Sequence, residues 1–268
     1  MTSASLAYKA IFFDMGGVVV GSPFQGISEY EKENGLPPNY INVAITRAGH
    51  QGAFQRLERG EVDIFDFYED FTKELSDPIN VSAYEQYCAR RGKVFDKSLK
   101  TLKIDGRALF HQMMRESLRV VPAMLYAVQQ LKASGKYKVA ALTNNFLYPT
   151  DERGLAEEAA LLASVQAKYP SDIFLGLDEL KQQFHHYIES AKLGLRKPDP
   201  AIFYKACEIA GVQPQEVVFL DDIGQNLKAA KQCGLTTIRV ELGQAEKAVA
   251  ELERVLGGTV KLTKQHKL

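Results

Sequence analysis

Polar residues follow three apolar runs of this chain at the points where each run ends. The run "AIFF" is followed by Asp14, "VAAL" by Thr143, and "VVFL" by Asp221 and Asp222. A lysine, Lys197, stands in "GLRKPDP" just before a predicted helix. Ligands of open parallel sheets bind at the carboxyl ends of the strands. A carboxylate, a hydroxyl, a lysine and an acidic pair on one such rim therefore form a candidate catalytic site.

Each of these signals has an ordinary structural explanation when it is taken alone. An Asp or Asn after a strand is commonly a helix cap or a turn residue, and a lysine before a proline is typical of a solvated loop. The combination favours chemistry, and it raises the question of whether Asp14 is a nucleophile. It also draws attention to Gly16, which stands two residues later, where a second acid could have stood.

The elements that must position these residues alternate between strand and helix. Short apolar runs predict strands at 9–14 and 138–145 and in "EVVFLDD" and "TTIRV", with "HHYIES" as a further short strand. Apolar residues at helical spacing predict intervening helices, one of which begins at Asp199 as N-cap with Pro200 in its first turn and stops at Gly211. This alternation predicts an α/β fold, a doubly wound parallel sheet with helices on both faces.

Roughly a hundred residues separate the first strand from the second, far more than the dozen or so that a crossover needs. We therefore expect a helical cap subdomain at 21–111, inserted into a Rossmann-like core that comprises 1–20 and 112–268. Aromatic and apolar residues at helical spacing predict the interior of that cap, namely Phe54, Leu57, Phe65, Phe67, Tyr68 and Phe71. A smaller helical insertion is expected at 150–184, and the tail "GGTVKLTKQHKL" is expected to be frayed.

The composition favours a small-molecule partner. Thirty-three basic and thirty-three acidic side chains cancel, so there is no electrostatic footprint for nucleic acid or for an anionic membrane. Three cysteines without a CxxC spacing argue against a disulfide framework, and the apolar run near the N-terminus is too short to span a bilayer. We expect a cytoplasmic protein that is a monomer or a homodimer.

Four motifs carry a resemblance to a known family: "FFDMGGVV", "ALTNN", "GLRKPDP" and "VVFLDDIGQNLKAA". The chain resembles the haloacid dehalogenase-like (HAD) hydrolase superfamily over about 8–20 and 120–245. Within that superfamily it is most similar to the N-terminal phosphatase-type domain of soluble epoxide hydrolase and to related sugar-phosphate phosphatases. The cap matches this pattern in position and helical character.

The resemblance implies a magnesium-dependent phosphatase that acts on a small phosphate ester. Asp14 would attack phosphorus and form an aspartyl-phosphate, which is reasonable because a dication makes a weak carboxylate nucleophile useful by neutralising the phosphate. Mg²⁺ would be held by Asp14, by Asp222 and by the main-chain carbonyl of Gly16, which are the hard oxygen ligands that this ion prefers.

The remaining motif residues receive supporting roles from the same resemblance. Lys197 would neutralise the nucleophile and a phosphate oxygen, while the Thr143 hydroxyl and the Asn144 N–H would donate to the transferring phosphoryl group. Asn226 would orient the site from outside the metal ligands. Asp221 has two possible roles, since it could hold Lys197 or cap the following helix.

Gly16 departs from the pattern of many phosphatases of the superfamily, which carry an acid there to protonate the leaving alkoxide. The absence of this acid predicts slow or leaving-group-selective turnover, because positioned acid–base catalysis typically contributes about 10²- to 10⁴-fold to the rate. Two alternatives stay open: a dehalogenase-type hydrolase, which needs no such proton, and a catalytically weak pseudoenzyme that binds a phosphorylated ligand or partner. His185 and His186 are interpreted as structural or surface residues.

Overall fold

A five-stranded parallel sheet forms the centre of the molecule. The computed structural model describes residues 8–169 and 175–263. The strands are β1 (Ala10–Phe13), β2 (Lys138–Thr143), β3 (His186–Glu189), β4 (Val217–Asp221) and β5 (Thr236–Arg239). Their spatial order is β3-β2-β1-β4-β5, and every neighbouring pair is parallel. The chain order therefore reverses at β1, between β2 and β4, which is where open parallel sheets bind ligands.

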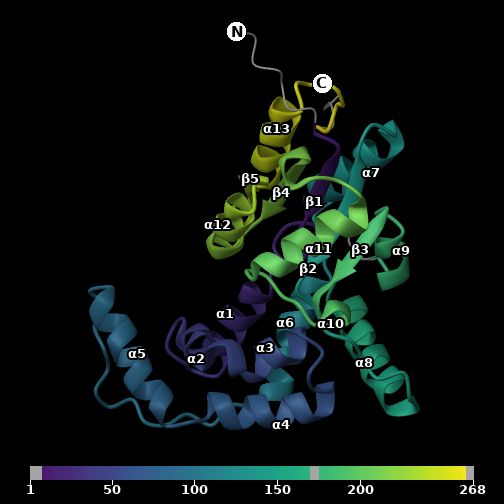
Figure 1. Cartoon of the computed structure of the whole chain (residues 1–268). Helices are drawn as coiled ribbons and strands as arrows, with labels where there is room; N and C mark the ends of the chain where they lie inside the picture. The colour runs from purple at the N-terminus through teal and green to yellow at the C-terminus, as the bar shows by residue number, and fades with distance from the viewer. Residues whose placement is uncertain (1–7, 170–174, 264–268) are drawn as a thin grey trace.

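Helices cover both faces of the sheet, as the alternating pattern predicts. Ile11 and Phe13 of β1 pack into a core with α7 (Pro122–Ser134) and α13 (Ala245–Val255), whereas Phe12 packs on the opposite face against α11 (Pro200–Ala210) and α12 (Gly224–Gln232). Successive strand residues point to opposite faces, so a wholly apolar strand such as β1 requires both layers of helices. The predicted doubly wound α/β fold is confirmed (Figure 1).

A group of helices between β1 and β2 forms the cap and has a hydrophobic core of its own (Figure 1). It comprises α1 (Pro23–Glu33), α2 (Tyr40–Ala48), the short η1 (Gly49–Gln51), α3 (Ala53–Glu58), α4 (Ile64–Leu75), α5 (Ile79–Arg90) and α6 (Gly106–Ser117). All six residues predicted for the cap interior join this core, with Phe54 and Phe65 partly buried and the other four buried. Helix α6 continues past residue 111, so the limit of the cap at that residue stays a prediction.

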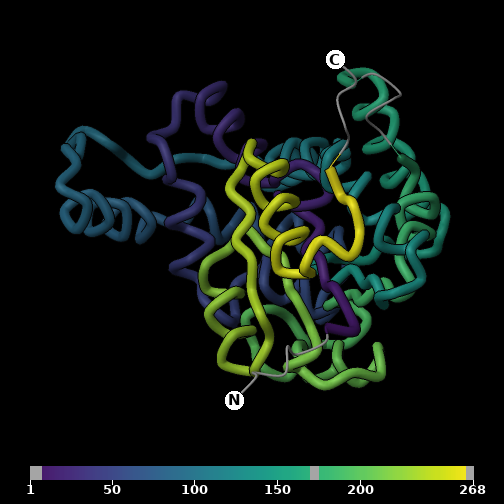
Figure 2. The backbone as a smooth tube through the Cα atoms, turned by 90° about the horizontal axis from the view of Figure 1, so that it is seen from above, coloured from purple at the N-terminus to yellow at the C-terminus, as the bar shows by residue number. Residues whose placement is uncertain are grey.

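The cap is uneven in shape, and one part of it extends away from the sheet. Figure 2 shows α5 and the segment after it projecting from the side of the molecule. In the described part of the chain, no helix is both long and apolar enough to cross a membrane.

The segment between β2 and β3 contains the second helical insertion, with α8 (Glu152–Lys168) and α9 (Leu177–Lys181). Two short helices, α10 (Ser190–Leu193) and η3 (Pro214–Glu216), precede α11 and β4. His185, just ahead of β3, accepts a hydrogen bond at Nδ1 from the backbone N–H of Val139, 3.0 Å away. This contact gives His185 a structural role.

The prediction of a frayed C-terminal tail is wrong as far as residue 263. Leu262 is almost fully buried in the core against α13, and its backbone N–H donates to Glu253 Oε2 at 3.1 Å. Lys261 pairs with the same glutamate. Leu262 and the partly buried Val260 pack on the core and hold the tail in place, and the rest of the predicted frayed end, 264–268, lies outside the described residues.

Candidate active site

The residues singled out in the sequence lie at the carboxyl ends of the central strands. Asp14 directly follows β1, Thr143 is the last residue of β2, and Asp221 is the last residue of β4, with Asp222 next to it. Lys197 lies between α10 and α11 and reaches the same rim. Strands β1 and β4 are neighbours, so their parallel register brings Asp14 and Asp221 together.

Lys197 is the centre of this cluster. Its Nζ lies 2.6 Å from Asp14 Oδ1 and 2.8 Å from Asp221 Oδ2, and its side chain is 1% exposed. A buried ammonium needs close anionic partners to offset its lost hydration. The two carboxylates provide them, and they raise the pKa of Lys197 against the opposing effect of burial. Lys197 therefore carries its charge beside Asp14.

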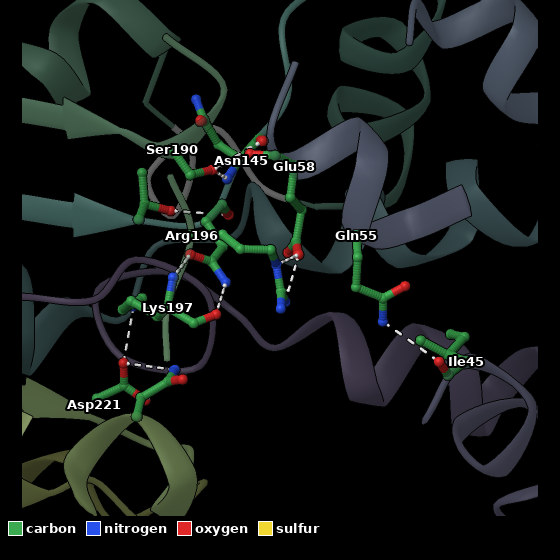
Figure 3. A network of polar contacts seen from close by, with 11 residues as sticks. Ile45, Gln55, Glu58, Asn145, Ser190, Arg196, Lys197 and Asp221 are labelled. Carbon is green, nitrogen blue, oxygen red and sulfur yellow. Dashed lines mark hydrogen bonds and ion pairs between the residues drawn. The ribbon is translucent and has the colours of Figure 1, made fainter. Parts of the chain in front are cut away.

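Asp221 holds Lys197 and is itself held by its neighbours (Figure 3). Its Oδ1 accepts from the backbone N–H of Ile223 at 2.7 Å. The Asn226 side-chain amide donates to both oxygens of Asp221, at 3.2 and 3.1 Å. Of the two roles left open for Asp221, the structure shows the contact with Lys197 directly, together with a bond to the backbone just ahead of α12.

Asn144 contacts the main chain of Lys197 through its side chain. The Lys197 N–H donates to Asn144 Oδ1 at 2.8 Å, and Asn144 Nδ2 donates to the Lys197 carbonyl at 3.0 Å. This pair of bonds fixes the lysine backbone, a role that the sequence did not indicate. Thr143 is buried, and Oγ1 donates to the Asn144 carbonyl at 3.2 Å. Within 8–169 and 175–263, Thr143 makes no side-chain bond to Lys197 or to the three carboxylates.

Two adjacent glycines form the turn after Asp14, and they differ in what they tolerate. Gly17 has φ +80°, and a Cβ there would lie 2.4 Å from Asp222 Oδ2. At Gly16 the nearest atom to an added Cβ would be Pro23 Cδ at 3.3 Å, and its φ lies outside the left-handed region. The role of Gly17 was missed in the sequence, although a Gly-Gly dipeptide signals a turn.

Comparison with known proteins decides the family. The model of the haloacid dehalogenase-like hydrolases matches residues 8–234, which include strands β1 to β4, the cap helices and every residue of the candidate site. This chain belongs to the HAD-like hydrolases. The predicted resemblance is thereby confirmed at the level of the family.

The relatives of this HAD-like hydrolase include larger proteins. Acyl-CoA dehydrogenase family member 10 of Mus musculus is 32% identical over 95% of this chain and 20% of its own length. Bifunctional epoxide hydrolase 2 of Sus scrofa is 29% identical over 94% of this chain and 39% of its own length. Glyceraldehyde 3-phosphate phosphatase of Methanopyrus kandleri is 24% identical over 66% of this chain and 68% of that protein. The chain thus spans less than half the length of the first two relatives.

Solved HAD structures share the fold. A dehalogenase with an intermediate complex is 20% identical and covers 93% of this chain and 97% of its own, with a TM-score of 0.53. A HAD enzyme of Bacteroides thetaiotaomicron, solved in complex with magnesium and inorganic phosphate, is 19% identical and covers 89% and 96%, with a TM-score of 0.50. At these identities the likeness shows the fold alone.

The charge of the site fits a divalent cation in this HAD-like hydrolase. One oxygen of each of Asp14, Asp221 and Asp222 lies within 4.8 Å of the others. Fully ionised, three carboxylates exceed the single Lys197 by two charges. Burial, followed by the neighbouring Asp221, raises the pKa of Asp222 to about 6. Burial also raises the pKa of Asp14 well above its usual range, although Lys197 opposes this. Both shifts arise mainly because burial disfavours the charged form of a carboxylate, and neighbouring carboxylates add to the effect.

Asp222 provides the observation that tests this fit. Its Oδ1 is buried and has no hydrogen-bond partner among the described residues. Buried polar atoms in folded proteins are nearly always bonded, so an orphaned carboxylate oxygen needs an explanation such as an ion. A hard cation held by Asp14 and Asp222 would give the Asp222 carboxylate a partner, and the donor set consists of the oxygen ligands that magnesium prefers.

Proposed function

We propose that this HAD-like hydrolase is a magnesium-dependent phosphatase of a small phosphorylated metabolite, with Asp14 as the phosphoryl acceptor. The observation that carries the proposal is Lys197 held between Asp14 and Asp221, in a cluster with Asp222, whose buried Oδ1 has no hydrogen-bond partner among the described residues. A carboxylate with a fixed ammonium on one side and further carboxylates that could hold a cation nearby is suited to approach an anionic phosphate.

The carboxylates of Asp14 and Asp222 and the carbonyl of Gly16 would hold the Mg²⁺ ion. When bound, this ion would neutralise part of the charge on the phosphate that Asp14 approaches. Asp221 would not be a ligand in this assignment, because its oxygens already bond Lys197, Ile223 and Asn226.

Asp14 would attack phosphorus through a carboxylate oxygen while the bond to the leaving oxygen breaks. Its Oδ1 accepts from the Met15 N–H at 2.7 Å and from Lys197, and within the described residues Oδ2 has no such bond. Lys197, the Thr143 hydroxyl and the Asn144 N–H would stabilise the charge on the transferring phosphoryl group. Water would then hydrolyse the aspartyl-phosphate.

The proton for the leaving oxygen must come from outside position 16, because glycine has none to give. A water beside Gly16, or a group of the substrate or of the cap, would supply it. Aryl, acyl and anomeric sugar phosphates leave more easily than simple alkyl phosphates, so we propose that they are the better substrates. The phosphatase from Methanopyrus supports a phosphorylated metabolite as the substrate class.

The cap and the core have different roles in the proposed function. We propose that the cap, predicted at 21–111 with α6 running on to Ser117, selects the leaving group by covering the site and excluding water, and that the rest of the chain forms the core. The balanced charge supports a small-molecule partner over nucleic acid or an anionic membrane, and we further propose that the protein is a cytoplasmic monomer or homodimer.

A phosphate-release assay on p-nitrophenyl phosphate and a panel of phosphorylated metabolites tests the function. We expect turnover with Mg²⁺, none after chelation with EDTA, and none in a folded Asp14→Asn variant. Halide release from a 2-haloacid without Mg²⁺ would instead establish a dehalogenase, an alternative that the acidic pair Asp221 and Asp222 disfavours. Tight, Mg²⁺-dependent binding of a beryllium fluoride phosphate mimic without any turnover would establish the pseudoenzyme.

A further inference from the structure

The C-terminal end of cap helix α3 lies directly on core helix α10. The Ser190 hydroxyl, at the start of α10, donates to the main-chain carbonyl of Glu58 at 2.6 Å. At Gly60 a Cβ would come within 2.5 Å of the Ala191 carbonyl, so the two backbones approach closely there. The core side of this contact is α10, which lies between β3 and Lys197 in the chain.

An ion pair strengthens the same junction. Arg196 donates through Nε, at 2.7 Å, and through Nη2, at 2.6 Å, to Glu58 Oε2. The Glu58 side chain is 11% exposed and that of Arg196 is 23% exposed. Charge-assisted bonds from the planar guanidinium are strong and directional, and their protection from solvent reduces screening.

The core partner of Glu58 directly precedes Lys197. The backbone of Lys197 is bonded by the Asn144 side chain, as described above, and the N–H of Asn145 donates to the Ser190 hydroxyl at 2.8 Å. Figure 3 shows Glu58, Arg196, Lys197, Asn145 and Ser190 in one continuous polar network. A displacement of the cap at Glu58 would therefore also displace or release residues 190–197, the segment that ends in Lys197.

We propose that Glu58 is a positioning residue, which couples the docking of the cap on the core to the placement of Lys197 through Arg196. The cap thereby takes part in building the phosphate end of the site as well as covering it. The kinetic consequence rests on the proposed phosphatase function, whereas the mechanical link between cap and core does not.

Hydrogen exchange measured by mass spectrometry tests the mechanical link. In Glu58→Gln, amides of 53–60 and 190–197 should exchange about 10-fold faster or more, because a buried ion pair loses its charge. Amides of β1 and β4 should keep the wild-type rate. Arg196→Lys, which keeps the charge but loses the two-pronged donor, should give the same pattern from the core side. The matched control is Asp70→Asn, which removes the cap-internal pair of Asp70 with Arg56, 3.1 Å apart.

Steady-state kinetics on p-nitrophenyl phosphate with Mg²⁺ tests the positioning role. Glu58→Gln should lower kcat about 10- to 100-fold while KM changes less than about 3-fold, because a misplaced Lys197 impairs the reaction more than substrate binding. Glu58→Asp, which keeps the charge, should restore part of the loss. Asp70→Asn should match the wild type in both constants.

Wild-type exchange at 190–197 in folded Glu58→Gln and Arg196→Lys proteins would overturn the link. A Glu58→Gln protein with faster hydrogen exchange at 190–197 but a wild-type kcat would overturn the positioning role. An equal loss of kcat in Asp70→Asn would also overturn it. If the wild type releases no phosphate from p-nitrophenyl phosphate, the proposed function fails, while the exchange experiment still decides whether Glu58 couples cap and core.

Discussion

Replacing Gly16 by aspartate should give this hydrolase the acid that it lacks. The backbone at Gly16 lies outside the left-handed region, so a side chain there causes no backbone strain. The added Cβ would meet Pro23 Cδ at 3.3 Å and Pro23 Cγ at 3.9 Å. The proline ring must give way by a few tenths of an ångström, which we expect to cost about 1 kcal/mol of stability, at the low end for overpacking.

The expected catalytic gain is larger than this cost. Positioned acid catalysis typically contributes about 10²- to 10⁴-fold, or about 2.7 to 5.4 kcal/mol of barrier. The gain should appear with poor leaving groups, since their alkoxides need the proton. With p-nitrophenyl phosphate, whose leaving group is a stable anion, we expect a change of less than about 10-fold. The carbonyl of residue 16 remains available as a metal ligand.

The assay compares kcat/KM of the wild type and Gly16→Asp over phosphate esters of increasing leaving-group pKa, with Mg²⁺ present. The dependence on leaving-group pKa should be steep in the wild type and shallower in the variant. Gly16→Asn is the matched control, because it has nearly the same shape but no carboxylic acid. A folded, Mg²⁺-binding Gly16→Asp protein with no gain on alkyl phosphates would refute the reasoning and show that the acid is already supplied elsewhere.

Two further predictions concern the metal site and acid stability. Gly17→Ala should weaken Mg²⁺ binding by about 10-fold or more in titration calorimetry, because the added Cβ would displace Asp222 Oδ2, 2.4 Å away, and φ +80° is unfavourable for alanine. The control Gly16→Ala should bind Mg²⁺ like the wild type. Equal Mg²⁺ affinity in the two variants would contradict this prediction. The bond from Arg107, assisted by His111 and Tyr68, lowers the pKa of Glu157 from 4.5 to about 2. Because the folded pKa is depressed, Glu157 stabilises the fold fully above about pH 4.5 and loses that contribution as the pH falls toward about 2. Glu157→Gln should therefore lower the free energy of unfolding at pH 7 by roughly 1 to 2 kcal/mol, a value reduced for solvent screening because Arg107 is 59% exposed. In urea unfolding, the variant should lose less stability than the wild type between about pH 5 and 2. If the free energy of unfolding of Glu157→Gln falls with pH as steeply as that of the wild type, Glu157 does not contribute to acid stability in this way.

Local signals in the sequence were sufficient for individual elements. Asp199 accepts from the Ala201 N–H at 2.9 Å, Pro200 is the first residue of α11, and Gly211 ends that helix with φ +60°. Each of these residues acts through the backbone within two or three positions of itself, so its effect can be predicted without knowing the fold. The tail around Leu262 shows the opposite case, because its burial depends on a core that is built from distant strands and helices.

Four motifs of the sequence by itself indicated the family. The sequence also predicted the alternation of strand and helix, and it singled out the candidate site residues, because strand ends in a parallel sheet share one rim. Only the tertiary structure decided how Lys197 bridges Asp14 and Asp221, and why Gly17 must lack a side chain against Asp222. It alone brought Glu58 to Arg196, 138 positions away. A glutamate near the end of a short helix is typical of a solvated surface, and its pairing depends on how an inserted cap docks on the core. Such contacts are set by the packing of whole segments, which neither periodicity nor local spacing can predict.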